Sequence, residues 1–236
     1  MTLSPRELEE LRPSLLRGLE ALEIPDPGTL AESLLRYTAE VYRFNDLYGL
    51  VEADPREFVS HHLLDSLSIL SPAVDLQILR RGRGGTGRLI DVGSGAGLPG
   101  IPIALALPEL SVTLMDRSGK RCGFLRNAAA ILRRPDLRVL QGELHRPPAE
   151  AVGSHELLLA RAFRPLRVEI FRGLAALLSE GGEMLLYKGR RQQVEQELEA
   201  LLEALPGAEL PGVEILDLEV PGLDKERTLL RFRMSA

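Results

Sequence analysis

The feature that most constrains this chain is a glycine loop that directly follows a short apolar segment. Residues Arg88–Val92 are typical of a buried strand, and Gly93-Ser94-Gly95-Ala96-Gly97 follows at once. Glycines adopt the backbone angles that a sharp strand-to-helix turn requires, and they let the backbone approach a ligand closely. The unit predicts an α/β sheet that binds a ligand at the carboxyl ends of its parallel strands.

Strand-like and helix-like segments alternate after the loop, which is typical of a mostly parallel sheet covered on both faces. We predict a Rossmann-like, doubly wound α/β domain over residues 88–236, with seven strands and an antiparallel pair at the sheet edge. The strands are expected at residues 88–92, 111–116, 137–140, 156–160, 182–188, 213–220 and 228–233. The helices are expected at residues 98–107, 118–132, 165–178 and 192–205.

Residues 1–79 are predicted to form a helical extension in front of this domain. Leucines recur at three- and four-residue steps in the first helix, and Ser4, Pro5 and Glu7 match an N-terminal capping box. Further helices are expected at residues 30–46 and 54–70. Residues 80–87 are rich in glycine and arginine and are predicted to be a linker.

Acidic residues near the glycine loop help to separate two kinds of cofactor. Asp116 ends the second strand, where a carboxylate can accept hydrogen bonds from ribose hydroxyls. Residues 95–100 also fit the dinucleotide pattern G-x-G-x-x-G, which is a weak signal by itself. An acid two residues before the first glycine, here Asp91, is typical of methyltransferases that use S-adenosylmethionine. The alternative is that Asp91 is a structural residue that accepts hydrogen bonds from the amides of the loop. Pro99 and Pro102 remove backbone donors that a pyrophosphate would need, which also favours S-adenosylmethionine.

The composition excludes several classes of protein. The single cysteine, Cys122, rules out an internal disulfide, and the four histidines show no metal-ligand spacing, so no metal is expected. No segment is apolar enough for a membrane span and no signal peptide is recognisable, so we expect a cytoplasmic protein. The net charge is −5, but residues 61–191 hold 19 basic and 12 acidic side chains and can present an anion-binding face.

The glycine loop continues as Leu98-Pro99-Gly100-Ile101-Pro102, and this extension is the most specific part of the motif. It resembles the RsmG family, also called GidB, of bacterial methyltransferases that act on small-subunit (16S) ribosomal RNA. Further matches are His62-Leu63-Leu64-Asp65-Ser66, Asp116 with Lys120-Arg121, Arg161-Ala162-Phe163 and Lys188-Gly189-Arg190. The resemblance covers roughly residues 35–200 and implies a class I methyltransferase fold. It also implies methyl transfer from S-adenosyl-L-methionine to N7 of a guanine near the decoding centre.

The motif and the resemblance together give the candidate cofactor-binding residues. The resemblance alone implies the positions near the adenine, at Leu144 and His145. The N-terminal region departs from the family pattern at Gly49 and Val51. The complete set is Gly93, Ser94, Gly95, Gly97, Leu98, Asp116, Leu144, His145 and Arg161.

Methylation of guanine N7 needs positioning more than a base, because N7 is a lone pair that carries no proton. No catalytic residue is therefore assigned, and Asn45, His62 and Asp65 are candidates for positioning. The structural alternatives are a helix cap for Asn45, a buried hydrogen-bonded imidazole for His62 and a salt bridge for Arg161. The candidates for RNA contact are Arg121, Arg161, Arg164 and Lys188.

The sequence leaves alternatives to ribosomal RNA methylation open. They are a methyltransferase of another substrate, an NAD-dependent oxidoreductase and a non-enzymatic RNA-binding module. The expected partner is small-subunit ribosomal RNA or the assembled subunit, and the chain is expected to be a monomer.

Overall fold

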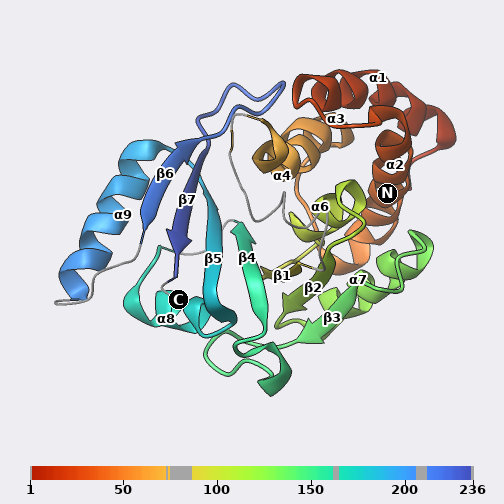
Figure 1. The fold of residues 1–236 in the computed structure, drawn as a ribbon. Coiled ribbons are helices and arrows are strands. Elements are labelled where there is room, and N and C mark those ends of the chain that lie inside the picture. The colour runs from red at the N-terminus through yellow and green to blue at the C-terminus, as the bar shows by residue number, and fades with distance from the viewer. Residues whose placement is uncertain (1, 73, 75–86, 162–164, 206–211, 235–236) are drawn as a thin grey trace.

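The computed structural model describes residues 2–72, 74, 87–161, 165–205 and 212–234. Its centre is a seven-stranded sheet in the order β3-β2-β1-β4-β5-β7-β6 (Figure 1). Neighbouring strands are parallel, except that β7 is antiparallel to both β5 and β6. The strands are β1 (Arg88–Val92), β2 (Ser111–Asp116), β3 (Arg138–Gln141), β4 (His155–Arg161), β5 (Leu178–Lys188), β6 (Val213–Asp217) and β7 (Thr228–Arg233).

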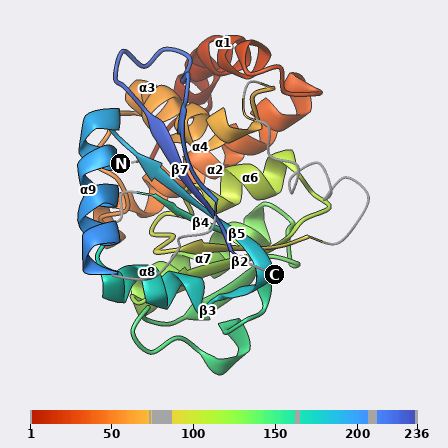
Figure 2. The same cartoon turned by 60° about the vertical axis from the view of Figure 1, so that its left-hand side comes forward.

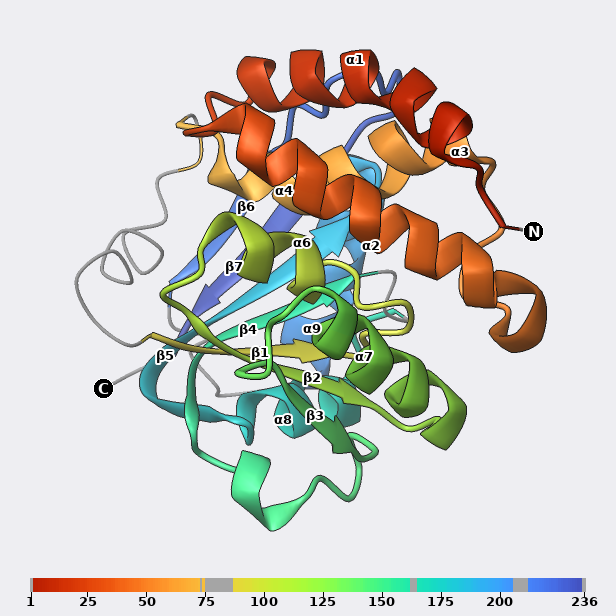
Figure 3. The same ribbon diagram turned by 90° about the vertical axis from the view of Figure 1, so that its right-hand side faces the viewer.

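Helices cover both faces of the sheet (Figures 1 and 3). Alternate strand residues enter two separate cores, as expected for a sheet buried on both sides. Leu89 and Leu157 pack with the N-terminal helices, α6 and α7, whereas Ile90 and Leu158 pack with α8 and α9. The helices are α1 (Pro5–Ala21), α2 (Pro27–Tyr48), α3 (Pro55–Phe58), α4 (Asp65–Leu67), α6 (Gly100–Ala106), α7 (Gly119–Ile131), α8 (Val168–Ala175) and α9 (Arg191–Ala204).

The predicted sheet is confirmed, and the strands β1, β2 and β7 have the predicted bounds. The predicted helix 165–178 is too long, because Leu178 already pairs with His155 of β4 at the start of β5. The predicted strand 213–220 is also too long. The amide of Leu218 donates to the carbonyl oxygen of Arg227 and closes the loop between β6 and β7. This loop extends from the sheet toward α1 and α3 (Figures 1 and 2).

The predicted third helix, residues 54–70, is wrong as a single α-helix. It consists of α3, a π-helical segment (Val59–Leu64), α4 and a short 3₁₀ turn (Ser68–Leu70). A π turn contains one extra residue, so the side chains that follow are rotated relative to a regular helix. His61, His62 and Asp65 lie in or directly after this segment, where their carbonyl and side-chain groups face β4.

The N-terminal helices pack directly on the sheet domain. The capping box of α1 is confirmed, since Ser4 and Glu7 exchange hydrogen bonds. The hydroxyl of Tyr37 in α2 donates to the carbonyl oxygen of Ala96 in the glycine loop at 2.7 Å. The predicted linker, residues 80–87, lies outside the described residues apart from Gly87, so the domain boundary stays a prediction.

Candidate active site

The carboxyl ends of four parallel strands meet at one edge of the sheet. The glycine loop follows β1, and β2, β4 and β5 end in Asp116, Arg161 and Lys188. The loop Gly49–Ala53 and the π-helical segment reach the same edge from the N-terminal helices. The structure thus brings together residues that the sequence places in six separate segments.

The glycine loop has the left-handed backbone that its composition predicts. The φ angles are +75° at Gly93, +58° at Gly95 and +95° at Gly97. A Cβ atom at Gly97 would lie 2.4 Å from Cδ1 of Ile101, so a side chain there has no room. A Cβ atom at Gly95 would meet only the carbonyl oxygen of Gly93 among the described residues, at 3.8 Å. The space in front of Gly95 is therefore open to a ligand.

Asp116 supports the glycine loop from the end of β2. Its Oδ2 accepts the amide of Gly95 at 2.9 Å, and its Oδ1 accepts the amide of Ser118 at 2.8 Å. A carboxylate offers about four acceptor positions, so both oxygens keep capacity for another donor. The arrangement is compatible with the predicted contact to ribose hydroxyls, which stays a prediction.

Asp91 holds the other side of the loop from a fully buried position. Its Oδ2 accepts the amide of Gly100 at 3.0 Å, in agreement with the structural role considered for it. Its Oδ1 is the one buried side-chain oxygen or nitrogen without a hydrogen-bond partner among the described residues. Burial raises the pKa of Asp91 to about 7, against the lowering effect of the Gly100 amide.

Two cavities open at this edge and share His62 and Arg161. The first, of 420 Å³, is lined by residues 93–96 of the glycine loop, Leu98, Arg121 and residues 49–53, whereas Gly97 does not line it. The second, of 530 Å³, lies between the π-helical segment, the ends of β4 and β5 and the loop that precedes β7. Both volumes fall within the usual range of small-molecule sites, about 300–1,000 Å³. Two adjoining cavities suit a reaction in which two bound molecules must come into contact.

A buried ion network forms the boundary between the two cavities. Nη1 of Arg161 donates to Oδ2 of Asp65 at 3.0 Å, and Nε of Arg227 donates to Oδ1 of Asp65 at 3.0 Å. The side chain of Asp65 is 4% exposed, and those of Arg161 and Arg227 are 14% and 23% exposed. One carboxylate therefore binds two guanidinium groups in a poorly solvated place.

His62 completes this network on the side of the glycine loop. Its Nδ1 lies 3.0 Å from Nη2 of Arg161 and accepts from that guanidinium, because a guanidinium carries only donors. Burial is the main reason that the pKa of His62 is lowered to about 4, and the neighbouring Arg161, His61 and Arg227 contribute to this lowering. His62 is accordingly neutral at pH 7.

The lowered pKa of His62 predicts a pH-dependent stability. In the unfolded state His62 binds a proton near its ordinary pKa of 6.5, whereas in the folded state it stays neutral down to about pH 4. The free energy of unfolding should therefore fall as the pH decreases from 6.5 to 4. We expect His62→Asn, which retains an acceptor for Arg161, to lose less stability than the wild type over this range. Urea unfolding at several pH values measures the free energy of unfolding of both proteins. Equal slopes of this free energy against pH for the wild type and His62→Asn would contradict the prediction.

Asn45 and two predicted RNA contacts have structural partners. Asn45 caps the end of α2, where its Oδ1 accepts the amides of Leu50 and Val51 and shapes the cavity wall. Nζ of Lys188 is 2.6 Å from Oε2 of Glu197, and the Lys188 side chain is only 7% exposed. Arg121 lines the first cavity with 43% of its side chain exposed, and it lies 3.9 Å from Asp116.

The residues predicted to lie beside an adenine are not part of either cavity. Leu144 packs against α8, where a Cβ atom at Gly173 would be 2.8 Å from its Cγ. His145 is 77% exposed and pairs with Glu143 at 3.1 Å. Arg164 lies outside the described residues. The cofactor and RNA contacts of these three residues stay predictions.

Arg227 and Lys225 are site residues that the sequence did not reveal. Both belong to the loop between β6 and β7. Arg227 binds Asp65 although the two residues are 162 positions apart in the sequence. Tyr187 is a third, because its buried hydroxyl donates to the carbonyl oxygen of Ser66 at 2.7 Å. No local pattern marks them, since their roles arise only when β7 enters the sheet beside β5.

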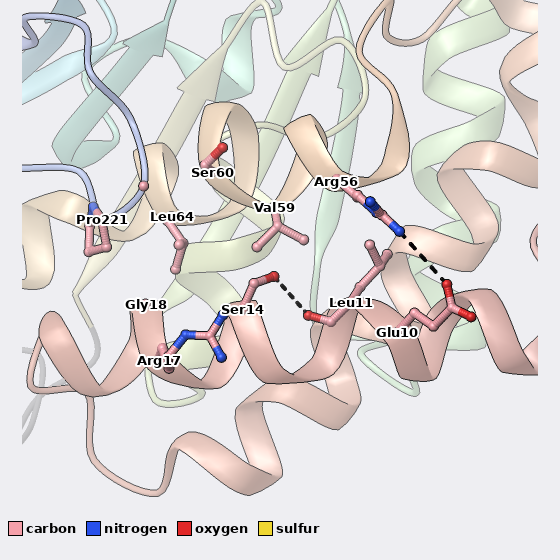
Figure 4. Close-up of a pocket in the computed structure, with 11 residues that line it drawn as sticks. Glu10, Leu11, Ser14, Arg17, Gly18, Arg56, Val59, Ser60, Leu64 and Pro221 are labelled. Atoms are coloured by element: carbon pink, nitrogen blue, oxygen red, sulfur yellow. Dashed lines mark hydrogen bonds and ion pairs between the residues drawn. The ribbon is translucent and has the colours of Figure 1, made fainter.

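A third cavity, of 460 Å³, lies between α1, residues 56–64 and the tip of the same loop (Figure 4). Its lining includes Ser60 and Leu64 of the π-helical segment, whereas His61 and His62 line the second cavity. Arg56 reaches Glu10 at 4.0 Å, and Arg17 has no ion pair with any described residue. None of the predicted site residues lines this cavity.

Comparison with known proteins identifies the family. Residues 30–216 match the family GidB, described as rRNA small subunit methyltransferase G. The chain belongs to this family. A ribosomal RNA small subunit methyltransferase G from Polaromonas naphthalenivorans is 36% identical over 226 residues, 95% of this chain and 96% of the relative. One from Alkalilimnicola ehrlichii is 39% identical over 231 residues, 97% of this chain and 94% of the relative. The resemblance inferred from the sequence is confirmed.

Solved structures show the same fold as this member of the methyltransferase G family. A putative S-adenosyl-L-methionine-dependent methyltransferase from Methanococcus maripaludis matches with a TM-score of 0.56 at 16% identity, over 86% of this chain and 94% of that one. A 16S rRNA (adenine(1408)-N(1))-methyltransferase from Catenulisporales acidiphilia matches with a TM-score of 0.51 at 18% identity, over 68% and 90%. The class I methyltransferase fold is therefore confirmed.

Two expected absences concern metals and membranes. No group of three or more possible metal ligands is found among the residues that the structure describes. Within the same residues, no helix has the length and apolar character that crossing a membrane requires.

Proposed function

We propose that this protein transfers a methyl group from S-adenosylmethionine to N7 of a guanine in small-subunit (16S) ribosomal RNA. One observation carries the proposal: the cavity at the glycine loop meets a second, partly basic cavity at His62 and Arg161. A cofactor in the first cavity would touch a nucleotide that enters from the second. Membership of the methyltransferase G family supports this assignment over an NAD-dependent oxidoreductase.

The first cavity fits S-adenosylmethionine, which when bound supplies a methyl group already activated on a sulfonium. The open space in front of Gly95 admits the cofactor against the backbone, and Gly93, Ser94, Ala96 and Leu98 complete this wall. Asp116 would accept from the ribose hydroxyls with the acceptor capacity that the loop amides leave.

The acceptor chemistry asks little of the protein beyond positioning. Guanine N7 is nucleophilic without deprotonation, so a neutral His62 and no general base are compatible with the reaction. Asp65 fixes the guanidinium of Arg161 at the junction of the cavities, and Asn45 fixes the loop that faces the glycines. Asn45, His62 and Asp65 are therefore proposed as positioning residues.

The proposed partner is small-subunit ribosomal RNA, alone or within the assembled subunit, and the proposed location is the cytoplasm. The exposed guanidinium of Arg121 at the rim of the first cavity suits a phosphate contact, which positions RNA without reading its sequence. We expect the protein to act as a monomer and without a metal ion.

Transfer of labelled methyl groups tests the proposal. The purified protein is incubated with labelled S-adenosylmethionine and with small subunits from cells that lack this modification, while large subunits serve as the control. We expect label on the RNA of the small subunits only. If S-adenosylmethionine binds in calorimetry but no label reaches small subunits, the substrate assignment is wrong and another substrate must be sought. RNA binding without cofactor binding would instead favour a non-enzymatic module.

A further inference from the structure

The second cavity contains more positive charge than its carboxylates neutralise. Four cations line it, and Lys188 is paired with Glu197 at 2.6 Å. Arg161 and Arg227 share the single carboxylate of Asp65, so one of these two positive charges is not neutralised by it. A positive charge without a counterion is costly in a place with little solvent, so such a site favours an anion.

The two guanidinium groups also keep unused hydrogen-bond donors. Arg161 donates through Nη1 and Nη2, and its Nε has no partner among the described residues. Arg227 donates through Nε and Nη1, while its Nη2 has none in that same part of the chain. Guanidinium groups bind phosphate through such donors. Nε of Arg161 and Nη2 of Arg227, which no described residue occupies, are therefore available to an oxyanion.

Lys225 adds a third cation on a loop whose neighbouring residues are fixed. The amide of Leu218 donates to the carbonyl oxygen of Arg227 at 2.8 Å, and the amide of Arg191 donates to Oε1 of Glu226 at 2.6 Å. These bonds tie the chain on the carboxyl side of Lys225. Lys225 itself is exposed at the cavity and has no ion pair with a described residue.

We propose that the second cavity is a phosphate subsite that binds one backbone phosphate of the acceptor RNA through Arg161, Arg227 and Lys225. The phosphate would adjoin the nucleotide whose base lies at the junction with the first cavity. Glu57, which also lines the cavity, limits the excess to about one positive charge and suits a singly charged phosphodiester. This inference rests on the proposed function for the source of the phosphate.

The subsite reassigns an RNA contact that the sequence placed on Lys188. That side chain is 7% exposed and neutralised by Glu197, whereas Lys225 is exposed and lines the same cavity without an ion pair to a described residue. Loss of one phosphate contact should weaken binding and reduce its dependence on salt, because fewer counterions are released.

The test compares Lys225→Gln with Arg17→Gln, which removes an exposed cation that lines the third cavity and has no ion pair with a described residue. Binding of unmethylated small subunits to the full-length protein is measured by filter binding between 50 and 200 mM salt. We expect Lys225→Gln to bind roughly 5–20-fold more weakly, and the slope of log Kd against log salt to fall by about 0.7–0.9. Arg17→Gln should match the wild type, and Lys225→Arg should restore most of the affinity.

Equal affinity and salt slope for Lys225→Gln and Arg17→Gln would overturn the subsite. So would a loss of S-adenosylmethionine affinity in Lys225→Gln, because the anion would then be the methionine carboxylate. Methyl transfer is measured separately on the wild type. If the wild type binds subunits through Lys225 but transfers no methyl group, the subsite stands and the proposed function fails. If transfer occurs and Lys225→Gln has no effect, the function stands and the subsite fails.

Discussion

Replacing Asp65 with alanine is expected to lower the free energy of unfolding by about 3–5 kcal/mol, the usual result of breaking a buried ion pair from one side. The change leaves Arg161 and Arg227 facing each other without a carboxylate, in side chains that are 14% and 23% exposed. Asp65→Asn keeps an acceptor and should cause a smaller loss. Denaturant unfolding at pH 7 without cofactor measures both variants.

Glu214→Ala is the matched control for Asp65→Ala. Glu214 also meets two guanidinium groups, those of Arg231 and Arg233, at 3.4 and 3.2 Å. Its side chain is 40% exposed, however, and exposed ion pairs contribute only about 0–1 kcal/mol. If Asp65→Ala lowers the free energy of unfolding no more than Glu214→Ala does, the ion network at the cavity boundary does not stabilise the fold.

The second large effect is expected for Gly95→Asp, which should weaken S-adenosylmethionine binding by at least roughly 100-fold. The new side chain would enter the open space in front of the loop and place a carboxylate near Asp116. An unpaired buried charge costs several kcal/mol, and each 1.4 kcal/mol is about tenfold in affinity. Isothermal titration calorimetry with the cofactor measures the change.

Gly153→Asp controls for backbone strain. Gly153 has φ +61°, close to the +58° of Gly95, and a Cβ atom there has no neighbour within 4 Å. It lies in a turn before β4, away from both cavities. Both variants should lose similar stability, because both force aspartate into the left-handed region. Wild-type cofactor affinity in Gly95→Asp would show that the first cavity is not the cofactor site.

The fold was largely predictable because its determinants are local. A strand, a glycine turn and a helix follow one another within residues 88–106, and periodic apolar residues mark the remaining elements. The predicted bounds were wrong where contacts between residues distant in the sequence determine the secondary structure. Leu178 joins β5 because it pairs with β4, and the π-helical segment (Val59–Leu64) interrupts a helix that the local sequence would continue.

The candidate site was predictable in part for the same reason. Each strand end carries a recognisable residue, and parallel strands bring Asp116, Arg161 and Lys188 to one edge. The partners of these residues could not be predicted. Whether Lys188 faces RNA or Glu197 depends on α9, and Asp65 acquires its second guanidinium from the loop before β7. Charge neutralisation is a property of the folded chain, so sequence alone cannot separate a free cation from a paired one.

Methyl transfer to guanine N7 is tested most directly by locating the methyl group on the RNA. N7-methylation makes guanosine cationic and sensitive to reduction followed by amine-induced strand cleavage. Small subunits that lack the modification are treated with the protein and S-adenosylmethionine, and the extracted 16S RNA is then reduced and cleaved. We expect cleavage at one new guanosine, and we expect this cleavage to disappear when Gly95→Asp replaces the wild type. Labelled RNA that resists cleavage would mean that an atom other than guanine N7 accepts the methyl group, and methylation of N7 would be ruled out.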